Sequence, residues 1–171
     1  MKRITFVVIA IVFLIFFSSS LFNYSGIFCY RLNNLQQAAS FYYLALKINP
    51  NNLSALHNLA VIEKDKKNLL VAQLILEKLI LKRPKWALAH KSLGVCLQLE
   101  GNIQGAEKEY LLALNLNPKL ASAWNNLGVL YAHQADFVQA RCCYLKALDL
   151  DPRNNITLSN YNKLNSKSRR M

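Results

Sequence analysis

The spacing of apolar and polar residues divides the chain into two parts. Residues 4–17 form an almost unbroken apolar run that follows Lys2 and Arg3. From residue 19 to residue 154, apolar side chains instead recur at the spacing of amphipathic helices, and the pattern returns every 34 residues. The sequence therefore predicts a helical repeat protein preceded by a segment of a different kind.

Four prolines mark the period of the repeat, because each lies 34 positions after the one before it. Two columns of small residues and one column of tyrosine or leucine have the same period. The columns are Pro50, Pro84, Pro118 and Pro152; Gly26, Ala60, Gly94 and Gly128; Ala38, Ala72, Ala106 and Ala140; and Tyr42, Leu76, Tyr110 and Tyr144. Small residues let the backbones of paired helices approach, and a proline after the second helix cannot continue it. We expect helices at residues 53–66, 69–82, 87–100, 103–116, 121–134 and 137–150.

The copy at residues 121–154 resembles the tetratricopeptide repeat (TPR), whose pattern it matches at eight positions. These positions hold Trp124, Leu127, Gly128, Tyr131, Ala140, Tyr144, Ala147 and Pro152. The copies at residues 87–120 and 53–86 are looser, and the first repeat, residues 19–52, is degenerate. The resemblance implies an all-α fold, a right-handed superhelical solenoid of antiparallel helix pairs in which each repeat buries its apolar face against its neighbours.

Two departures from the TPR pattern stand out. His90 occupies the position where Trp is usual, so we expect a core or interfacial histidine there. Glu63 occupies a position where an aromatic residue is usual. After the last repeat, residues 155–165 carry apolar residues among polar ones and are expected to form the capping helix, and residues 166–171 are expected to be a basic disordered tail.

The N-terminal segment has the pattern of a secretory signal peptide or of a signal anchor. The stretch from Ile4 to Phe22 is nineteen residues long, about the length that spans a bilayer as a helix. Because the chain stays apolar beyond a possible cleavage site after Ser20, we expect a retained transmembrane anchor over residues 1–22. A cleaved signal peptide, which would leave a secreted or periplasmic protein, and a buried soluble helix are the alternatives.

Flanking charge predicts how this anchor is oriented. Lys2 and Arg3 precede the span and only Arg31 follows it closely, so the N-terminus is expected in the cytoplasm and the repeats on the opposite side. The first helix of repeat one, expected at residues 20–31, overlaps the end of the span. Either the membrane helix continues into it, or the repeat is degenerate and residues 35–47 cap the stack. We expect three complete repeats preceded by a partly membrane-embedded one.

The chain is basic, with a formal net charge of +12 and an isoelectric point near 9.7. Part of this charge forms a basic patch around Pro84, made of Lys82, Arg83, Lys85 and Lys91. An acidic protein partner, anionic lipid and nucleic acid would each fit such a patch. Nucleic acid is disfavoured because the aromatic residues occupy packing positions and are not interleaved with the basic ones.

No catalytic or metal-binding motif is present in the sequence. The cysteines Cys29, Cys96, Cys142 and Cys143 form no CxxC pair and are expected to pack as small apolar residues. The three histidines fall in three different repeats, and neither a phosphate loop nor a nucleophile motif appears. We therefore expect a protein that is not an enzyme and needs no cofactor or metal.

The TPR resemblance implies a concave groove that holds an extended or helical segment of another protein. The groove positions are His57, Asn58, Val61, Lys64, Lys91, Ser92, Val95, Gln98, Asn125, Asn126, Val129, His133 and, in the cap, Asn160. Asn58, Asn126 and Asn160 share one repeat position and resemble the asparagine ladder of the eukaryotic O-GlcNAc transferase repeats. Amides of this kind can bind a peptide backbone with little regard for its sequence. The clamp that other TPR proteins use for a C-terminal aspartate lacks its residues here.

These features predict a membrane-tethered scaffold that binds a protein partner and helps to assemble or localise a complex. One alternative is a TPR protein of the photosystem I assembly type, from plastid or cyanobacterial membranes. Another is a peripheral binder that holds anionic lipid or nucleic acid through the basic patch. The identity of the partner and the oligomeric state cannot be read from the residues.

Overall fold

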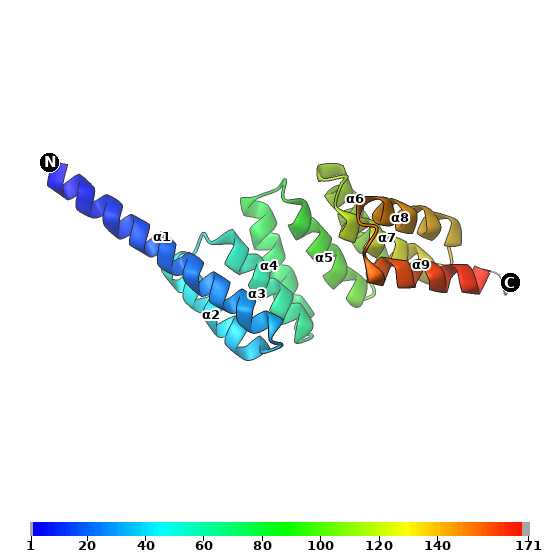
Figure 1. Ribbon diagram of the computed structural model, residues 1–171, viewed down its shortest axis with the longest axis horizontal. Coiled ribbons are helices and arrows are strands. Elements are labelled where there is room, and N and C mark those ends of the chain that lie inside the picture. Colours follow the sequence, from blue (N-terminus) through cyan, green and yellow to red (C-terminus); the bar gives the residue numbers. More distant parts are fainter. Residues whose placement is uncertain (1, 169–171) are drawn as a thin grey trace. The chain divides into compact units, whose positions relative to one another are not determined.

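The computed structural model describes the backbone of residues 2–168 and the side chains of residues 17–166, and these residues form helices without any strand (Figure 1). The helices are α1 (Lys2–Arg31), α2 (Leu35–Ile48), α3 (Leu53–Asp65), α4 (Leu69–Lys82), α5 (Ala87–Leu99), α6 (Ile103–Leu116), α7 (Ala121–His133), α8 (Phe137–Leu150) and α9 (Asn155–Ser168). The all-α fold is confirmed. The helices expected between residues 53 and 150 begin where the sequence places them and end within one residue of it.

The chain divides into two compact units, Met1–Leu79 and Ile80–Met171. In the first unit, α1 packs against α2, and α2 packs against α3. Tyr42 is fully buried between α1 and α2, where it joins a core that includes Ala38, Ala45 and Leu59. A Cβ atom added to Gly26 would lie 2.5 Å from the ring of Tyr42, so only glycine leaves room for this ring.

In the second unit, α5 pairs with α6, α7 pairs with α8, and α9 packs against α8. The same glycine and tyrosine contact occurs in both pairs: Gly94 faces Tyr110, and Gly128 faces Tyr144. A Cβ atom at either glycine would lie 2.7 Å from the nearest ring atom. The two recurring columns of the sequence therefore have one physical cause, a tyrosine ring packed on the backbone of the neighbouring helix.

Asparagine and aspartate side chains begin the second helices of the repeats, a feature that the sequence analysis missed. The side chains of Asn34, Asn102 and Asp136 each accept a hydrogen bond from the backbone N–H three residues later. These residues lie in one further column of the 34-residue period. A side-chain oxygen at this position satisfies one of the N–H groups that a helix leaves unpaired at its start.

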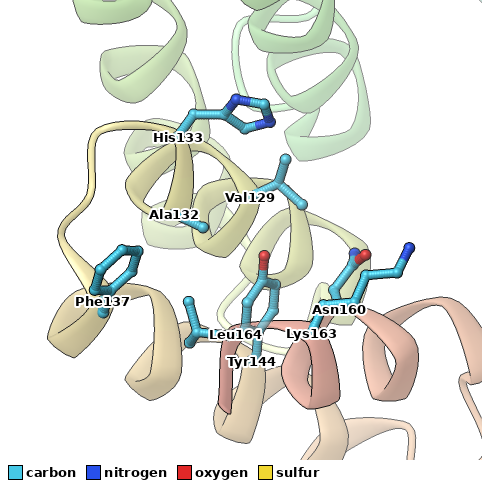
Figure 2. Close-up of a pocket in the computed structure, with 8 residues that line it drawn as sticks. All are labelled: Val129, Ala132, His133, Phe137, Tyr144, Asn160, Lys163 and Leu164. Atoms are coloured by element: carbon cyan, nitrogen blue, oxygen red, sulfur yellow. The ribbon is translucent and has the colours of Figure 1, made fainter. Parts of the chain in front are cut away.

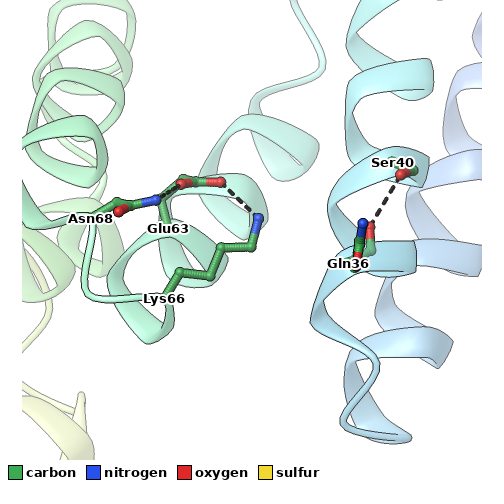
Figure 3. Close-up of polar contacts among 5 residues, drawn as sticks. All are labelled: Gln36, Ser40, Glu63, Lys66 and Asn68. Carbon is green, nitrogen blue, oxygen red and sulfur yellow. Dashed lines mark hydrogen bonds and ion pairs between the residues drawn. The ribbon is translucent and has the colours of Figure 1, made fainter.

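Glu63 is almost fully buried, and its carboxylate is held from two directions (Figure 3). Asn68 donates to one carboxylate oxygen at 2.8 Å, and the Lys66 ammonium lies 3.3 Å from the other. A hydrogen bond from the Ser40 hydroxyl to the Gln36 carbonyl, in α2, is drawn beside it. Repeat two therefore replaces the usual aromatic residue with a carboxylate whose desolvation is offset by an amide and an ammonium group.

The expected transmembrane anchor over residues 1–22 is not supported by the structure. The side chains of residues 1–16 lie outside the described residues. Among the residues that are described, none of the helices combines the length and the apolar character that a membrane crossing requires. The backbone shows α1 as one continuous helix from Lys2 to Arg31, so the first helix of repeat one is the C-terminal part of a longer helix.

The C-terminal helix is longer than the sequence suggests. It begins at Asn155, as the capping helix is expected to, and it runs to Ser168 rather than residue 165. Asn154 accepts from the backbone N–H of Thr157 at its start, and Ser166 donates to the carbonyl of Lys163 near its end. Residues 166–168 therefore belong to the helix, and residues 169–171 of the expected disordered tail lie outside the described residues.

Candidate functional site

The expected groove residues of the first unit lie on α3, and most of them are engaged with the protein itself. His57 is buried, and Val61 is half-buried. The Lys64 ammonium lies 2.6 Å from the Asp65 carboxylate, which compensates its charge. The amide of Asn58 donates to the amide oxygen of Asn23 at 3.1 Å. Among the described residues, this is the hydrogen bond recorded for the Asn58 side chain, and an amide has a second N–H and an oxygen besides.

A second set of amides is linked in the same way in the second unit. Asn160 on α9 donates to the oxygen of Asn125 at 3.1 Å, and Asn125 donates to the oxygen of Asn126 at 3.3 Å. The asparagines of the expected ladder thus bond to amides of the preceding repeat, or to an adjacent amide. These bonds orient the amide groups. The binding of a peptide by the ladder stays a prediction.

The remaining groove residues on α5 are packed to different degrees. Ser92 is buried, Lys91 is half-buried, and Val95 packs beside the core that surrounds Tyr110. Gln98 accepts a hydrogen bond of 2.8 Å from the hydroxyl of Tyr110. Burial raises the pKa of Tyr110 well above its ordinary value, with a smaller contribution from Cys96, so this hydroxyl remains a donor at neutral pH.

A cavity of about 330 Å³ lies beside α7, α8 and α9 (Figure 2). It brings together three of the expected groove residues, Val129, His133 and Asn160. The other lining residues are Ala132, Phe137, Tyr144, Lys163 and Leu164. Ala132 lies on α7 at a groove position of the first helix, so the TPR pattern reaches it as well. The other four residues are missed by that pattern, because Phe137 and Tyr144 come from the second helix of the repeat and Lys163 and Leu164 from the cap.

The polar groups of this cavity are donors or basic groups. Tyr144 is 2% exposed, yet its hydroxyl points toward the cavity in Figure 2 and has no hydrogen-bond partner among the described residues. Burial, with a smaller effect from Cys143, raises the pKa of Tyr144 to about 12. Lys163 and Asn160 line the same cavity. Such a set can hold an acceptor of hydrogen bonds, above all a negatively charged one.

His90 is confirmed as a core histidine, and its hydrogen bonds explain how it replaces tryptophan. Its Nε2 atom donates to the carbonyl of Pro84 at 2.8 Å. In the next repeat, the indole N–H of Trp124 donates to the carbonyl of Pro118 at 2.9 Å. The Nδ1 atom of His90 lies 2.7 Å from the Glu109 carboxylate, a pairing that the sequence analysis missed. These contacts assign His90 a structural role.

The basic patch lies at the end of α4 and in the turn that follows it. Lys82, Arg83 and Lys85 are exposed, and Lys91 is half-buried. The guanidinium carbon of Arg83 lies 6.0 Å from the centre of the Trp86 ring, at the outer limit of a cation–π contact. The expectation that no aromatic residue accompanies the patch is therefore wrong for this one pair.

The cysteines differ from one another in exposure. Cys29, Cys96 and Cys143 are buried, as expected for small packing residues, whereas Cys142 is exposed on α8. Burial, with a smaller effect from Cys142, raises the pKa of Cys143 to about 11, so this thiol is unreactive at neutral pH. Within the part of the chain that the structure describes, no three His, Cys, Asp or Glu side chains gather as a metal site.

Comparison with known proteins identifies the repeat. The sequence profile of the tetratricopeptide repeat matches residues 121–154 and residues 19–52. A 75-residue segment is 36% identical to the uncharacterized protein ycf37 of Porphyra purpurea, and the match covers 43% of this chain and 43% of that protein. The chain thus matches less than half the length of this relative.

Solved structures share the fold. A thermophilic TPR protein of Thermus thermophilus is similar with a TM-score of 0.81 and 20% identity, over 88% of this chain and 82% of that one. YrrB, described as a TPR protein with an unusual peptide-binding site, is similar with a TM-score of 0.65 and 20% identity, over 83% and 73% of the two chains. The helix pairs, the glycine and tyrosine columns and these matches together lead to one conclusion: residues 19–52 and 121–154 are tetratricopeptide repeats, and the described helices have the fold of TPR proteins.

Proposed function

We propose that the chain is a non-catalytic scaffold that binds a segment of another protein and helps to assemble or localise a complex. The cavity beside α7, α8 and α9 carries this proposal, because it joins expected groove residues with the hydroxyl of Tyr144, which has no hydrogen-bond partner among the described residues. TPR proteins in general bind peptides or proteins, and YrrB is a TPR protein with an unusual peptide-binding site. No nucleic acid is needed for this role.

The amides linked to this cavity support binding of an extended segment. Asn125 and Asn126 are half-buried, and each amide retains hydrogen-bonding groups that the contacts between asparagines do not use. A peptide backbone presents N–H and C=O groups in alternation, so an oriented amide can satisfy either of them. We propose that Asn126 holds the backbone of the segment next to the cavity.

Capture of a partner tests this function directly. Immobilised full-length protein is incubated with detergent-solubilised membranes of the source organism, and the bound proteins are identified by mass spectrometry. Asn126→Ala should abolish most of the specific capture, because it removes an amide that hydrogen bonds link, through Asn125, to Asn160 of the cavity. Gln139→Ala, which removes an exposed side-chain amide from α8, is the matched control and should capture normally. Equal capture by both variants would contradict the proposed role of the groove.

We further propose that α1 holds the protein at a membrane. Phe17, Leu21, Tyr24 and Phe28 are each more than half exposed, and their spacing places them on one face of α1. The opposite face packs on α2 through Gly26 and Cys29. An exposed apolar stripe that continues the apolar run of residues 4–17 is suited to lipid. The proposed orientation has the N-terminus in the cytoplasm and the repeats across the membrane, or the repeats secreted or periplasmic if the segment is cleaved.

Alkaline carbonate extraction of membranes tests the anchor. We expect full-length protein in the membrane pellet, because a transmembrane helix resists extraction whereas electrostatic attachment does not. The same chain without residues 2–16 should appear in the supernatant. Release of the full-length chain would contradict the anchor while leaving the binding function open.

A role in photosystem I assembly is a second candidate. Its supporting observation is the 36% identity to the protein of Porphyra purpurea, a photosynthetic organism. If this candidate is right, capture from solubilised photosynthetic membranes should return photosystem I subunits. Their absence from the captured proteins would remove this candidate and leave the general scaffold role.

Binding of anionic lipid or nucleic acid through Lys82, Arg83, Lys85 and Lys91 is a third candidate, which the exposed charges and the neighbouring Trp86 support. Salt separates it from groove binding. Attachment through the patch should weaken steeply as salt is raised, since it depends on displaced counterions. Binding through amides and a buried cavity should persist at moderate salt.

A further inference from the structure

The cavity beside α7, α8 and α9 results from one difference between the third and fourth repeats. In the third repeat, the hydroxyl of Tyr110 donates to Gln98 at 2.8 Å. Thirty-four residues later, Tyr144 occupies the place of Tyr110, and Ala132 occupies the place of Gln98. Alanine offers no acceptor and leaves the volume of the longer side chain empty. The side chain of Tyr144 is therefore buried, and its hydroxyl is directed toward the cavity and has no hydrogen-bond partner among the described residues.

Two further differences make this cavity basic. His133 occupies the position of Leu99 in the repeat before it, and Lys163 occupies the position of Val129. Neither basic side chain forms an ion pair with a carboxylate among the residues that the structure describes, and none of the lining residues is acidic. Positions that are apolar in the preceding repeat are thus basic at this cavity, and the cavity favours negative charge.

The donors of the cavity are suited to a carboxylate. The Tyr144 hydroxyl, the second N–H of the Asn160 amide and the Lys163 ammonium can each donate a hydrogen bond. Because burial keeps the pKa of Tyr144 at about 12, its hydroxyl stays protonated at the pH at which a carboxylate is ionised. Hydrogen bonds between an ionised group and such donors are stronger than those between neutral groups.

The walls and the size of the cavity limit what can enter. Val129, Ala132, Phe137 and Leu164 supply apolar surface to its walls. A volume of about 330 Å³ is at the small end of the range for ligand pockets, roughly 300–1,000 Å³, and is sufficient for one side chain. A glutamate side chain has two methylene groups for the apolar walls and a carboxylate for the donors.

We propose that this cavity binds the carboxylate of a glutamate side chain in the partner segment, with Tyr144, Asn160 and Lys163 as its donors. The inference rests on the proposed function, because Asn125 and Asn126 would hold the backbone of the same segment. Asn160 connects the two sites through its hydrogen bond to Asn125. The cavity would thereby select for one side chain of the segment, whereas the amides of the groove bind only its backbone.

Nuclear magnetic resonance of the full chain in detergent micelles, with labelled tyrosine rings and asparagine side chains, tests this assignment. The probe is N-acetyl-L-glutamate N-methylamide, and the neutral control is N-acetyl-L-glutamine N-methylamide. We expect the glutamate compound to shift the signals of Tyr144 and Asn160 in a saturable way. The affinity for the glutamine compound should be lower by about tenfold or more, because this compound lacks the charge that strengthens the hydrogen bonds.

Ala132→Gln is the decisive variant, because it restores the residue that the third repeat has at this position. The new side chain should fill the cavity and accept from Tyr144, as Gln98 does from Tyr110, so the fold is retained and binding of the glutamate compound is lost. Lys163→Val, which copies Val129, should weaken binding about tenfold or more. Val138→Ala, at an exposed position on α8, is the control and should leave binding unchanged.

Three results would overturn the assignment: no saturable shift with the glutamate compound, equal binding of the two compounds, or undiminished binding by Ala132→Gln. Capture of the partner by the same variants separates this inference from the proposed function. If Ala132→Gln captures the partner normally while Asn126→Ala does not, the groove function stands and the glutamate site is wrong.

Discussion

The third and fourth repeats have the same helix pair but solve two packing problems with different residues. At the position where TPR sequences favour tryptophan, the third repeat has His90 and the fourth has Trp124, and both donate to a proline carbonyl six residues earlier. His90 is paired with Glu109, and the position that corresponds to Glu109 in the fourth repeat holds Cys143. A polar pair thus replaces an apolar one. The shared requirement is the hydrogen bond to the proline carbonyl, which closes the turn between repeats.

The second difference concerns space rather than polarity. In the third repeat, Gln98 accepts a hydrogen bond from the hydroxyl of Tyr110. In the fourth repeat, the shorter Ala132 lines a cavity at this position, and the hydroxyl of Tyr144 has no hydrogen-bond partner among the described residues. A repeat protein can therefore keep its glycine and tyrosine contact and still gain a binding site by shortening one neighbouring side chain. This cavity lies in the repeat whose sequence agrees best with the family.

Removal of His90 should have the largest effect on stability. His90→Ala is expected to lower the free energy of unfolding by about 3 kcal/mol, because it leaves the Glu109 carboxylate without its buried partner and opens a cavity. Urea unfolding of the full chain, followed by circular dichroism, measures this change. His90→Trp combined with Glu109→Cys, which copies the fourth repeat, should recover most of the loss. A loss below about 1 kcal/mol for His90→Ala would show that the pair contributes little.

Exchange of the cavity residues between the two repeats should have opposite effects. Gln98→Ala is expected to cost about 2 kcal/mol, because it leaves the buried Tyr110 hydroxyl unpaired. Ala132→Gln is expected to add about 1 kcal/mol through one new hydrogen bond and a filled cavity. Hydrogen exchange of α6 and α8 assigns each change to its repeat. If Ala132→Gln destabilises α8, the two repeats do not share the geometry on which the comparison depends.

Substitution of the glycines that face Tyr110 and Tyr144 should also reveal the difference in space between the two repeats. Gly94→Ala is expected to lower the free energy of unfolding by about 1 kcal/mol, since the overpacking of Tyr110 exceeds the gain in helix propensity. Gly128→Ala should cost less, because the ring of Tyr144 can shift toward the cavity, whereas Tyr110 is held by Gln98. Urea unfolding of the two variants measures both costs. In the background of Ala132→Gln the two costs should become equal, and a persistent difference would mean that the cavity is not its cause.

The fold could be predicted from the sequence because a few columns carry most of the packing. Glycine and tyrosine at a fixed spacing determine how the helices of a pair approach, and proline ends the second helix, so the helix ranges followed directly. The cavity could be predicted only in part. Val129, His133 and Asn160 lie at groove positions, but the role of Tyr144 depends on what Ala132 lacks, and a missing acceptor appears only when two repeats are compared in space.

The contact between His90 and Glu109 could not be predicted for a related reason. The two residues lie nineteen positions apart on α5 and α6, and a pairing between helices depends on their rotation about their axes. The same holds for the bonds between Asn58 and Asn23 and between Asn160 and Asn125, which join neighbouring repeats. Such polar contacts leave no periodic signal when each occurs in only some repeats.

The smallest effect is expected at the surface of the fourth repeat. The ammonium of Lys146 lies 4.3 Å from the centre of the Trp124 ring, and the third repeat has Leu112 in the corresponding position, near His90. Lys146→Leu should cost about 0.5 kcal/mol, the usual size of an exposed cation–π contact, although leucine retains part of the apolar contact with the ring. When Lys146→Leu is made in the background of Trp124→Leu, it should leave the free energy of unfolding unchanged, because no ring remains for the ammonium to contact. A double-mutant cycle from urea unfolding gives this coupling energy, and a coupling near zero would show that Lys146 is only a solvated residue beside the ring.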